Sequence, residues 1–235
     1  MSQHIDKVCD ILRGGGIVLL YDADGREEET DMVVASEFVN QDTVRIFRKD
    51  GGGLICVTIP PETRRVIGIP YMVDVLDNSM KHFPILGGLK PNDIPYDAKS
   101  SFSLTINHRK TFTGITDKDR ALTISQFAKV VKMSLSCDNG QAADTFTSNF
   151  RSPGHVHLLN ASDRLVLDRQ GHTELATALM TLAGVTPTAT ICEMMGDDGR
   201  ALSREKAKEY AAKNGLPYLD GAEVIKAYKE SLGLN

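Results

Sequence analysis

The densest concentration of titratable side chains lies in ten residues, 22–31, which read DADGREEETD. This window holds six acidic residues and one basic residue, whereas the whole chain of 31 acidic and 27 basic residues carries a net charge of −4. Like charges this close repel each other, so a fold tolerates them where water screens them or where a cation and a polyhydroxy or phosphorylated ligand neutralise them. The acidic window is therefore the first candidate site.

A second candidate site is the segment RQGHTE at 169–174, which places basic, imidazole and hydroxyl groups at a predicted helix start. Free N–H groups and the helix dipole favour a phosphate at such an end, and an arginine adds a fork of donors. An ordinary helix cap with a surface histidine is the alternative for this pattern alone. The residues concerned are Arg169, Gln170, Gly171, His172 and Thr173.

Two further patterns carry candidate ligands or acids. His155 and His157 alternate onto one face of a predicted strand, which suits either a transition metal or ordinary hydrogen bonds. Glu193 ends an apolar strand, where it either works in a site or reaches solvent, because an unpaired buried carboxylate is costly. Together the patterns indicate a hard-cation site of carboxylates plus one histidine beside a phosphate cradle. Because Mg²⁺ keeps few protein ligands and accepts substrate oxygens, we expect a phosphorylated small molecule as substrate.

Strands on both sides must hold the acidic window in place. Apolar runs at 17–21 and 32–38 bracket it and predict two buried strands. A loop between two core strands has fixed ends, so its side chains can be aimed. An amphipathic helix precedes these strands and is predicted to stop at the glycines that begin with Gly14.

Helices and strands mix along the rest of the chain. Thr123 is predicted to cap a helix that runs to about Met133, and the polar stretch 134–149 is predicted to be a surface loop insertion. We expect an α/β (α+β) fold with one catalytic domain over 1–235, a sandwich of a mixed β-sheet flanked by helices. The other predicted helices are 40–50, a short one from Pro60–Pro61, 172–184, 203–213 and a last one opened by Asp220 and Glu223; the other predicted strands are 51–59, 100–108, 155–160, 188–194 and 216–219.

Composition narrows the class of protein. The 235 residues, 41% hydrophobic and 25% charged, are typical of a globular protein with a substantial core. No apolar run approaches the length of a membrane span and the N-terminus lacks a signal pattern, so we expect a cytoplasmic protein with no membrane partner. Four scattered cysteines predict reduced thiols rather than disulfides or a zinc site. The charge balance does not predict nucleic-acid binding.

Six blocks of sequence together resemble the 3,4-dihydroxy-2-butanone 4-phosphate synthase family, in the family's order and over about residues 5–228. The resemblance implies conversion of D-ribulose 5-phosphate to L-3,4-dihydroxy-2-butanone 4-phosphate and formate, a step of riboflavin biosynthesis catalysed by a carbon–carbon lyase. It implies a monofunctional, archaeal-like form. The blocks are REEETD (26–31), GGLIC (52–56), FTGITDKDRA (112–121), RSPGHV (151–156), RQGHTE (169–174) and CEMM (192–195).

The resemblance also implies roles for single residues. Glu27 and His172 match the positions that hold Mg²⁺, for which Mn²⁺ is a substitute, while Arg26 and Asp31 match those that contact the sugar. Segment 169–173 matches the phosphate-binding part. The implied substrate-binding set is Arg26, Glu27, Asp31, Arg169, Gln170, Gly171, His172, Thr173 and Glu193.

The catalytic residues implied by the resemblance are acids and one histidine. Glu193 and His155 match positions essential for catalysis, and Asp31 joins them as a candidate for moving protons to and from the sugar carbon next to the ketone. Cys56 either lines the pocket or is a plain core residue. The family's active sites lie near a subunit interface, so we expect a homodimer that shares residues between sites.

Three positions depart from the family's usual pattern. Glu28 stands where asparagine or glycine is usual, and Thr30 where many members have glycine. His157 stands where an apolar or aromatic residue is common, which argues against a metal site built from His155 and His157.

Two other functions compete with this interpretation. The run VLLYDADG (18–25) and the later GDDG (196–199) are typical of a haloacid-dehalogenase-type phosphatase with Asp22 as nucleophile, but Arg26 replaces the threonine expected there. A non-catalytic metal- or nucleotide-binding module is the other alternative, and it leaves the predicted phosphate cradle unexplained.

Overall fold

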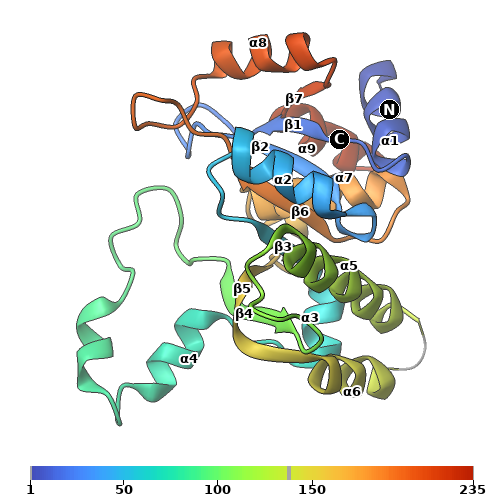
Figure 1. Cartoon of the computed structure of the whole chain (residues 1–235). Helices are drawn as coiled ribbons and strands as arrows, with labels where there is room; N and C mark the ends of the chain where they lie inside the picture. Colours follow the sequence, from blue (N-terminus) through green and yellow to red (C-terminus); the bar gives the residue numbers. More distant parts are fainter. Residues whose placement is uncertain (1, 137–138, 235) are drawn as a thin grey trace.

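The two strands that bracket the acidic window are an antiparallel pair in the computed structural model, which describes residues 2–136 and 139–234. These strands, β1 (Val18–Tyr21) and β2 (Thr30–Ala35), are buried along their whole length, as predicted. They lie in a seven-stranded sheet with the order β4-β5-β3-β6-β2-β1-β7 within the described residues (Figure 1). The remaining strands are β3 (Cys56–Ile59), β4 (Phe102–His108), β5 (Phe150–Asn160), β6 (Ala189–Glu193) and β7 (Tyr218–Asp220).

The sheet is mixed, which confirms the predicted fold class. β1 pairs in parallel with β7, and β3 pairs in parallel with β5. The other neighbouring pairs are antiparallel. The helices are α1 (Gln3–Arg13), α2 (Gln41–Asp50), α3 (Pro61–Ile67), α4 (Met72–Ser79), α5 (Asp117–Ser134), α6 (Asn139–Asn149), α7 (His172–Ala183), α8 (Arg204–Asn214) and α9 (Gly221–Ser231), and short 3₁₀ turns span Ser36–Phe38, Pro84–Leu89 and Leu165–Leu167.

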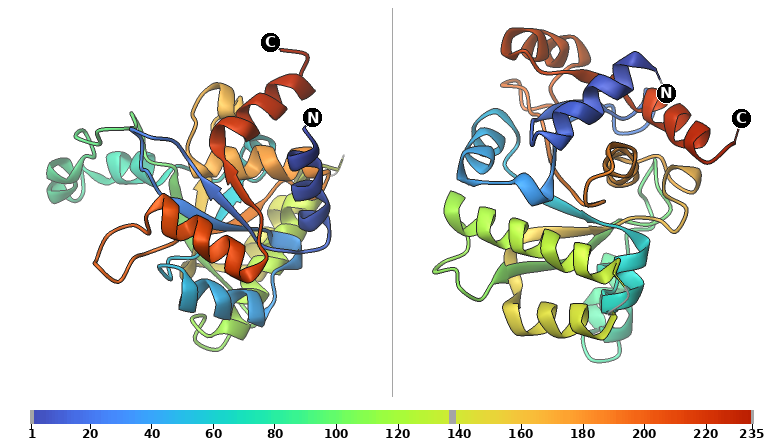
Figure 2. Two further views of the ribbon diagram at one scale, coloured as in Figure 1. Left: turned by 90° about the horizontal axis from the view of Figure 1, so that it is seen from above. Right: turned by 90° about the vertical axis from the view of Figure 1, so that its right-hand side faces the viewer.

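Two hydrophobic cores form on the two faces of the sheet, because side chains alternate along a strand. Val18 and Leu20 of β1 lie in one core together with α1, α7 and α9. Leu19 lies in the other core with α2 and α5. Figures 1 and 2 show these helices on the two sides of the sheet. A single sheet therefore carries both cores, and the described residues form a single domain.

Several sequence predictions about helix ends are confirmed. Helix α1 is followed by its C-cap at Gly14, and α9 begins with a capping box in which Asp220 and Glu223 satisfy each other's backbone N–H groups.

Within the described residues, no helix is both long and apolar enough to span a membrane. The predicted thiols are free and buried at Cys9, Cys56 and Cys192, whereas Cys137 lies outside the described residues.

The prediction of a surface loop over 134–149 is wrong, because residues 139–149 form α6. This mostly polar helix has two apolar side chains one turn apart. Ala142 is fully buried, and the ring of Phe146 stacks on Phe150 and lies edge-on to Phe127. Residues at i and i+4 share one helix face. A stripe of two residues is enough to hold this helix against α5, but it is too short to stand out in a sequence.

The predicted start at Thr123 of the preceding helix, α5, is also wrong. Helix α5 begins at Asp117, and the side chain of Thr116 accepts a hydrogen bond from the N–H of Asp119 as the cap. Thr123 lies inside the helix, where its hydroxyl donates to the carbonyl of Asp119 and accepts from the N–H of His108. The hydroxyl of Thr123 therefore ties α5 to the end of β4 instead of starting the helix.

Two strands have different bounds from those predicted. β5 begins at Phe150 rather than at 155, because residues 150 and 151 pair with the end of β4. β3 begins only at Cys56, since the preceding glycines turn: the N–H of Gly52 donates to the carbonyl of Glu193, and Gly53 has a φ of +87°. The extended β5 is the element that carries His155.

Close backbone approach between β4 and β5 requires glycine at 154. A Cβ there would lie 2.0 Å from the carbonyl carbon of Ile106 and 2.3 Å from the nitrogen of Asn107. We expect Gly154→Ala to lower the free energy of unfolding by about 3 kcal/mol, because backbone atoms cannot yield as a flexible side chain does. Denaturant unfolding measures this loss. Gly140→Ala is the matched control, since a Cβ there meets nothing within 4 Å; an equal loss in both variants would contradict the prediction.

Candidate active site

Asp22 shapes the acidic loop between β1 and β2 from inside. Its side chain is buried, and its two carboxylate oxygens accept hydrogen bonds from the N–H groups of Glu27 at 3.0 Å and Glu29 at 3.2 Å. Arg26 donates to it as well, at 3.1 Å. These contacts fix the shape of the loop, and strand β2 follows the loop where the phosphatase interpretation needs a helix, so the structure does not support that interpretation.

Glu28 adopts the left-handed conformation, with a φ of +58°. Its carboxylate accepts a hydrogen bond from the N–H of Gly25 at 2.8 Å. Glycine or asparagine adopts this backbone at lower cost, which explains the usual residues at this position in the resemblance. The acidic loop therefore carries local backbone strain at Glu28.

Relief of that strain is a testable consequence. We expect Glu28→Asn to raise the free energy of unfolding by up to about 1 kcal/mol, because asparagine tolerates the left-handed region. Urea unfolding at neutral pH measures the change. Asp24→Asn removes the same charge from an exposed position of the loop and serves as the control; a less stable Glu28→Asn variant would contradict the prediction.

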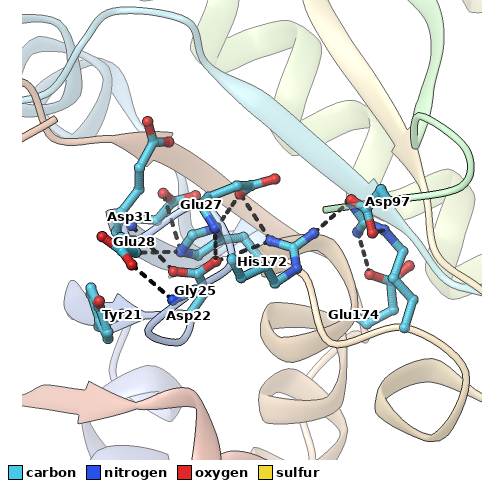
Figure 3. A network of polar contacts seen from close by, with 12 residues as sticks. Tyr21, Asp22, Gly25, Glu27, Glu28, Asp31, Asp97, His172 and Glu174 are labelled. Carbon is cyan, nitrogen blue, oxygen red and sulfur yellow. Dashed lines mark hydrogen bonds and ion pairs between the residues drawn. The ribbon is translucent and has the colours of Figure 1, made fainter. Parts of the chain in front are cut away.

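Glu27 and His172 meet across the site, although 145 residues separate them in sequence. Oε2 of Glu27 lies 3.1 Å from Nδ1 of His172 (Figure 3), and Nε2 of His172 lies 3.2 Å from the carbonyl oxygen of Glu29 and 3.5 Å from Oδ1 of Asp31. The loop supplies Glu27, and the first residue of α7 supplies His172. The structure thus brings together the two predicted metal ligands.

Glu27 and His172 stabilise each other in their ionised forms. Burial alone would raise the pKa of Glu27, but the hydrogen bond and charge of His172 and the charge of Arg26 lower this pKa to about 2. Burial would lower the pKa of His172, but the charges of Asp31, Glu27 and Asp22 raise it to about 9. Without a metal, the pair is therefore a carboxylate and an imidazolium at neutral pH.

Asp31 and Glu193 face each other on neighbouring strands. They are directly paired residues of β2 and β6, so both carboxyl groups come to one end of the sheet. Asp31 is 1% exposed, and neither of its oxygens has a hydrogen-bond partner among the described residues. Burial raises its pKa well above the ordinary value, and the negative charge of Glu193 raises it further against the opposing charge of His172. Burial also raises the pKa of Glu193.

Two arginines gather at the start of α7. The N-cap residue Gly171 makes no side-chain cap, and a Cβ there would lie 2.2 Å from Nη1 of Arg169 and 2.6 Å from Nη2 of Arg26. Glycine therefore lets both guanidinium groups approach the open end of the helix. Arg169 pairs with the buried Glu174, and both arginines pair with Asp97 (Figure 3).

A cavity connects these groups. Most of the predicted site residues line it: Glu27, Asp31, Arg169, His172, Thr173 and Glu193. Cys56 lines the cavity as well and is buried, so both alternatives for this residue hold. Gln170 is exposed and lines a different hollow, beside Tyr21 and Arg204.

Segment 94–102 forms one wall of the cavity, and no sequence pattern indicated it as part of the site. It contributes Ile94, Tyr96, Asp97, Ser100, Ser101 and Phe102. These residues have neither the charge density of the acidic loop nor a helical or strand period, and only the start of the following strand was predicted. The one available signal was a pair of polar residues, Ser100 and Ser101, directly before an apolar strand.

His155 does not line this cavity. Its side chain is exposed on β5, and its Nδ1 lies 3.1 Å from Nδ2 of Asn107. His157 is partly buried, with its ring edge-on to Phe102. The two histidines therefore do not lie with the other candidate ligands, as the unusual residue type at 157 predicts.

The donor set fits a divalent cation. Asp22, Glu27 and His172 each offer one ligand atom, and these atoms lie within 4.8 Å of one another. Oδ1 of Asp31 lies 3.5 Å from Nε2 of His172, so this buried carboxyl group offers further oxygen atoms beside the three donors. Oxygen donors with one imidazole and a substrate oxygen suit Mg²⁺ or Mn²⁺. Asp22 is the candidate ligand that the sequence did not indicate.

Comparisons with known proteins agree with one another. The sequence model of the 3,4-dihydroxy-2-butanone 4-phosphate synthase family matches residues 6–227. The chain is 50% identical over 227 residues to the 3,4-dihydroxy-2-butanone 4-phosphate synthase of Methanothermobacter thermautotrophicus, covering 96% of both chains. It is 46% identical over 232 residues to the synthase of that name from Archaeoglobus fulgidus, covering 98% of this chain and 96% of the relative.

Solved structures give the same result. A structure of 3,4-dihydroxy-2-butanone 4-phosphate synthase in complex with two magnesium ions matches with a TM-score of 0.75 and 25% identity, covering 100% of both chains. A cation-free form of a protein of that name matches with a TM-score of 0.73 and 25% identity, covering 98% of this chain and 99% of that one. With the family model spanning nearly its whole length, the chain belongs to the 3,4-dihydroxy-2-butanone 4-phosphate synthase family.

Proposed function

We propose that this chain converts D-ribulose 5-phosphate to L-3,4-dihydroxy-2-butanone 4-phosphate and formate in a magnesium-dependent reaction of riboflavin biosynthesis. The observation that carries the proposal is the contact of Glu27 with His172 in a cavity that also holds Arg169 at an open helix start. The cavity thus has a candidate cation site at one end and a candidate anion site at the other. These suit a sugar phosphate, whose hydroxyl and carbonyl oxygens lie at one end and whose phosphate lies at the other.

Glu27 and His172 are the proposed metal ligands, with Asp22 close enough to add a third donor. A divalent cation bound there supplies positive charge to stabilise negative charge that develops on the sugar oxygens, and Mn²⁺ fits the same donors. Because His172 and Glu27 form an ion pair without the metal, His172 must lose a proton when it becomes a ligand.

The phosphate is proposed to bind at the start of α7. Arg169 offers its guanidinium, Thr173 its hydroxyl, and residues 171–173 their N–H groups at the positive end of the helix dipole. Arg26 lies between this end and Glu27, at 3.1 Å from the Glu27 carboxylate, where it can contact the sugar.

Asp31 and Glu193 are the proposed proton-transfer groups. Both line the cavity and both have a raised pKa, so each can hold a proton nearer to neutral pH than an ordinary carboxyl group. Among residues 2–136 and 139–234, no side chain or backbone group makes a hydrogen bond to Asp31, so its oxygens can take the proton next to the substrate's ketone. Glu193 is more exposed and can exchange protons with solvent.

His155 is proposed to act in the site of a partner subunit of a homodimer. It is exposed outside its own cavity, and its partner Asn107 packs against Gly114 of a loop that exposes 93% of Phe112. Such exposed apolar side chains favour an association surface. Light scattering measures the oligomeric state, and a monomer would contradict the dimer.

Mixing two inactive variants tests whether His155 acts in the partner's site. Half of the dimers from equal amounts of His155→Ala and Glu27→Gln are mixed, and each mixed dimer has one intact site if His155 crosses the interface. We expect recovery of roughly a quarter of wild-type activity after exchange of subunits. No recovery would mean that His155 serves its own subunit.

One assay tests the proposed reaction. Purified protein with D-ribulose 5-phosphate and Mg²⁺ is expected to release formate while phosphate remains esterified, and a chelator is expected to stop the reaction. Formate is measured with a coupled dehydrogenase and inorganic phosphate by a colorimetric method. Release of inorganic phosphate, or no turnover, would refute the proposal.

A further inference from the structure

Asp97 holds both arginines of the proposed phosphate end with one carboxylate. It accepts a hydrogen bond from Nη2 of Arg26 at 2.7 Å and from Nε of Arg169 at 3.1 Å, and Nη2 of Arg169 donates a further short one. The three side chains are largely buried, with exposed fractions of 10% for Asp97, 11% for Arg26 and 17% for Arg169. Figure 3 shows Asp97 at the end of the network opposite Asp31.

The guanidinium groups of Arg26 and Arg169 each pair with a second, fully buried acid. Asp22 accepts from Nη1 of Arg26, and Glu174 accepts from Nη1 of Arg169; neither acid has any exposed side-chain surface. These pairs fix the arginines to the acidic loop and to α7. With the Glu27 carboxylate at 3.1 Å from Arg26, Asp97 is a fourth acid for two cations, and of these four acids it is the one that contacts both arginines.

The position of the Asp97 carboxylate is that of a bound anion. The two guanidinium groups that it contacts are the same ones that crowd the missing Cβ of Gly171 at the open start of α7. Asp97 lines the cavity and contacts both arginines, so an anion that enters the cavity and binds both guanidinium groups takes the place of this carboxylate. A phosphate dianion offers more charge and more acceptor oxygens to the same donors than a carboxylate does.

The segment that carries Asp97 can move without exposing a core. No residue from 70 to 100 is buried, although the segment includes α4 and a 3₁₀ turn. Figure 1 shows this stretch as an arm beside the sheet. Near Asp97, Lys99 pairs with the exposed Asp74 at 3.0 Å and lies over the ring of Tyr71, and both of these partners belong to the same segment. Segments with few buried contacts open at low cost.

We propose that Asp97 is a positioning residue that occupies the phosphate position of the free enzyme and yields it to the phosphate of the substrate. This proposal rests on the proposed phosphate site at 169–173. While bound, the carboxylate keeps the two arginines apart from each other and aimed at one point. Because it must be displaced, it also makes binding selective: an unphosphorylated sugar offers the arginines nothing in exchange for Asp97.

Calorimetry with inorganic phosphate on the full chain tests this role. Asp97→Asn should bind phosphate more tightly by on the order of tenfold, as expected if Asp97 leaves about one molecule in ten open, and Asp97→Glu should restore the weaker binding. Asp93→Asn removes the same charge from an exposed position of the same segment and should not change the dissociation constant. Unchanged or weaker binding in Asp97→Asn would overturn the proposal, because a residue that only supports the arginines gives that result.

A second measurement does not require Asp97 to be replaced. The chain has no tryptophan, so Tyr96→Trp gives a single emitter next to Asp97 and near the Arg26 guanidinium. Saturating phosphate should move its emission to longer wavelength as the segment leaves the arginines. Phosphate binding without such a shift would overturn the proposal.

Both measurements are independent of turnover. A protein that passes them but releases no formate from D-ribulose 5-phosphate would support the role of Asp97 and refute the proposed reaction. Arg169→Gln locates the heat of binding, because it should abolish phosphate binding if the site is the start of α7. Retained binding in this variant would overturn the placement of Asp97 in the phosphate position.

Discussion

Glu27→Gln is expected to lower kcat/KM for formate release by roughly a thousandfold, because the amide carries no charge for a divalent cation and no longer stabilises charge at the reacting oxygens. His172→Ala should have an effect of similar size, since it removes the other ligand of the pair. Steady-state assays with D-ribulose 5-phosphate over a range of Mg²⁺ concentrations measure both losses. Circular dichroism checks that each variant folds.

The matched control for this prediction is Glu28→Gln. Glu28 lies next to Glu27 in the same loop and is exposed. Its carboxylate accepts a hydrogen bond from the N–H of Gly25, and the side-chain oxygen of glutamine can accept the same bond. It loses the same charge but should keep near-normal activity. Near-normal activity in Glu27→Gln would mean that the metal site is elsewhere.

An NMR titration separates the loss of the ion pair from a loss of fold. In metal-free wild-type protein, the His172 imidazole should titrate near pH 9, because the charges of Asp31 and Glu27 outweigh burial. In Glu27→Gln this pKa should fall, since the glutamine carries no charge. An unchanged pKa in a folded variant would contradict the contact between Glu27 and His172.

The local part of the site could be predicted from the sequence. Acids crowded between two apolar runs, such as Glu27 and Asp31, stand out because a fold rarely tolerates such charge without a ligand. The start of α7 at His172 could also be predicted, because Gly171 directly precedes a run of apolar residues with helical spacing. That these two segments meet followed only from the resemblance, because strand order is set by contacts far apart in sequence.

The parts that could not be predicted are those whose position depends on tertiary contacts. Helix α6 is held by Phe146 against rings from two other elements, so its own period is too weak to indicate a helix. Asp97 lies in a segment without buried residues, and only the arginines from two distant elements give its carboxylate a place. The sequence predicted His155 as a catalytic residue, but the exposure of His155 outside its own cavity is a property of the fold that the sequence does not indicate.

Asp31→Asn is the second change with a large expected effect. Asparagine has nearly the same shape but cannot accept a proton at a useful pKa, so we expect kcat for formate release to fall by about 10²- to 10⁴-fold. Glu193→Gln is the comparison, because Glu193 faces Asp31 across the same pair of strands but is more exposed. If Asp31→Asn kept normal kcat, proton transfer would belong to another group.

The same variant should change how stability depends on pH in metal-free protein. The folded-state pKa of Asp31 is raised, mainly by burial, so between its unfolded and folded pKa values the folded protein binds a proton that the unfolded chain does not. Ionised Asp31 therefore destabilises the folded protein, and this destabilisation is complete above the folded-state pKa. It is lost as the pH falls from the folded-state pKa toward the unfolded-state pKa. As the pH falls from above the raised folded-state pKa of Asp31 toward the ordinary range of an aspartate, wild type should gain free energy of unfolding relative to Asp31→Asn, as urea unfolding would measure. A constant difference between the two proteins would mean that Asp31 titrates at its ordinary pKa, and its two unpartnered oxygens would then have to be satisfied by water in the folded protein.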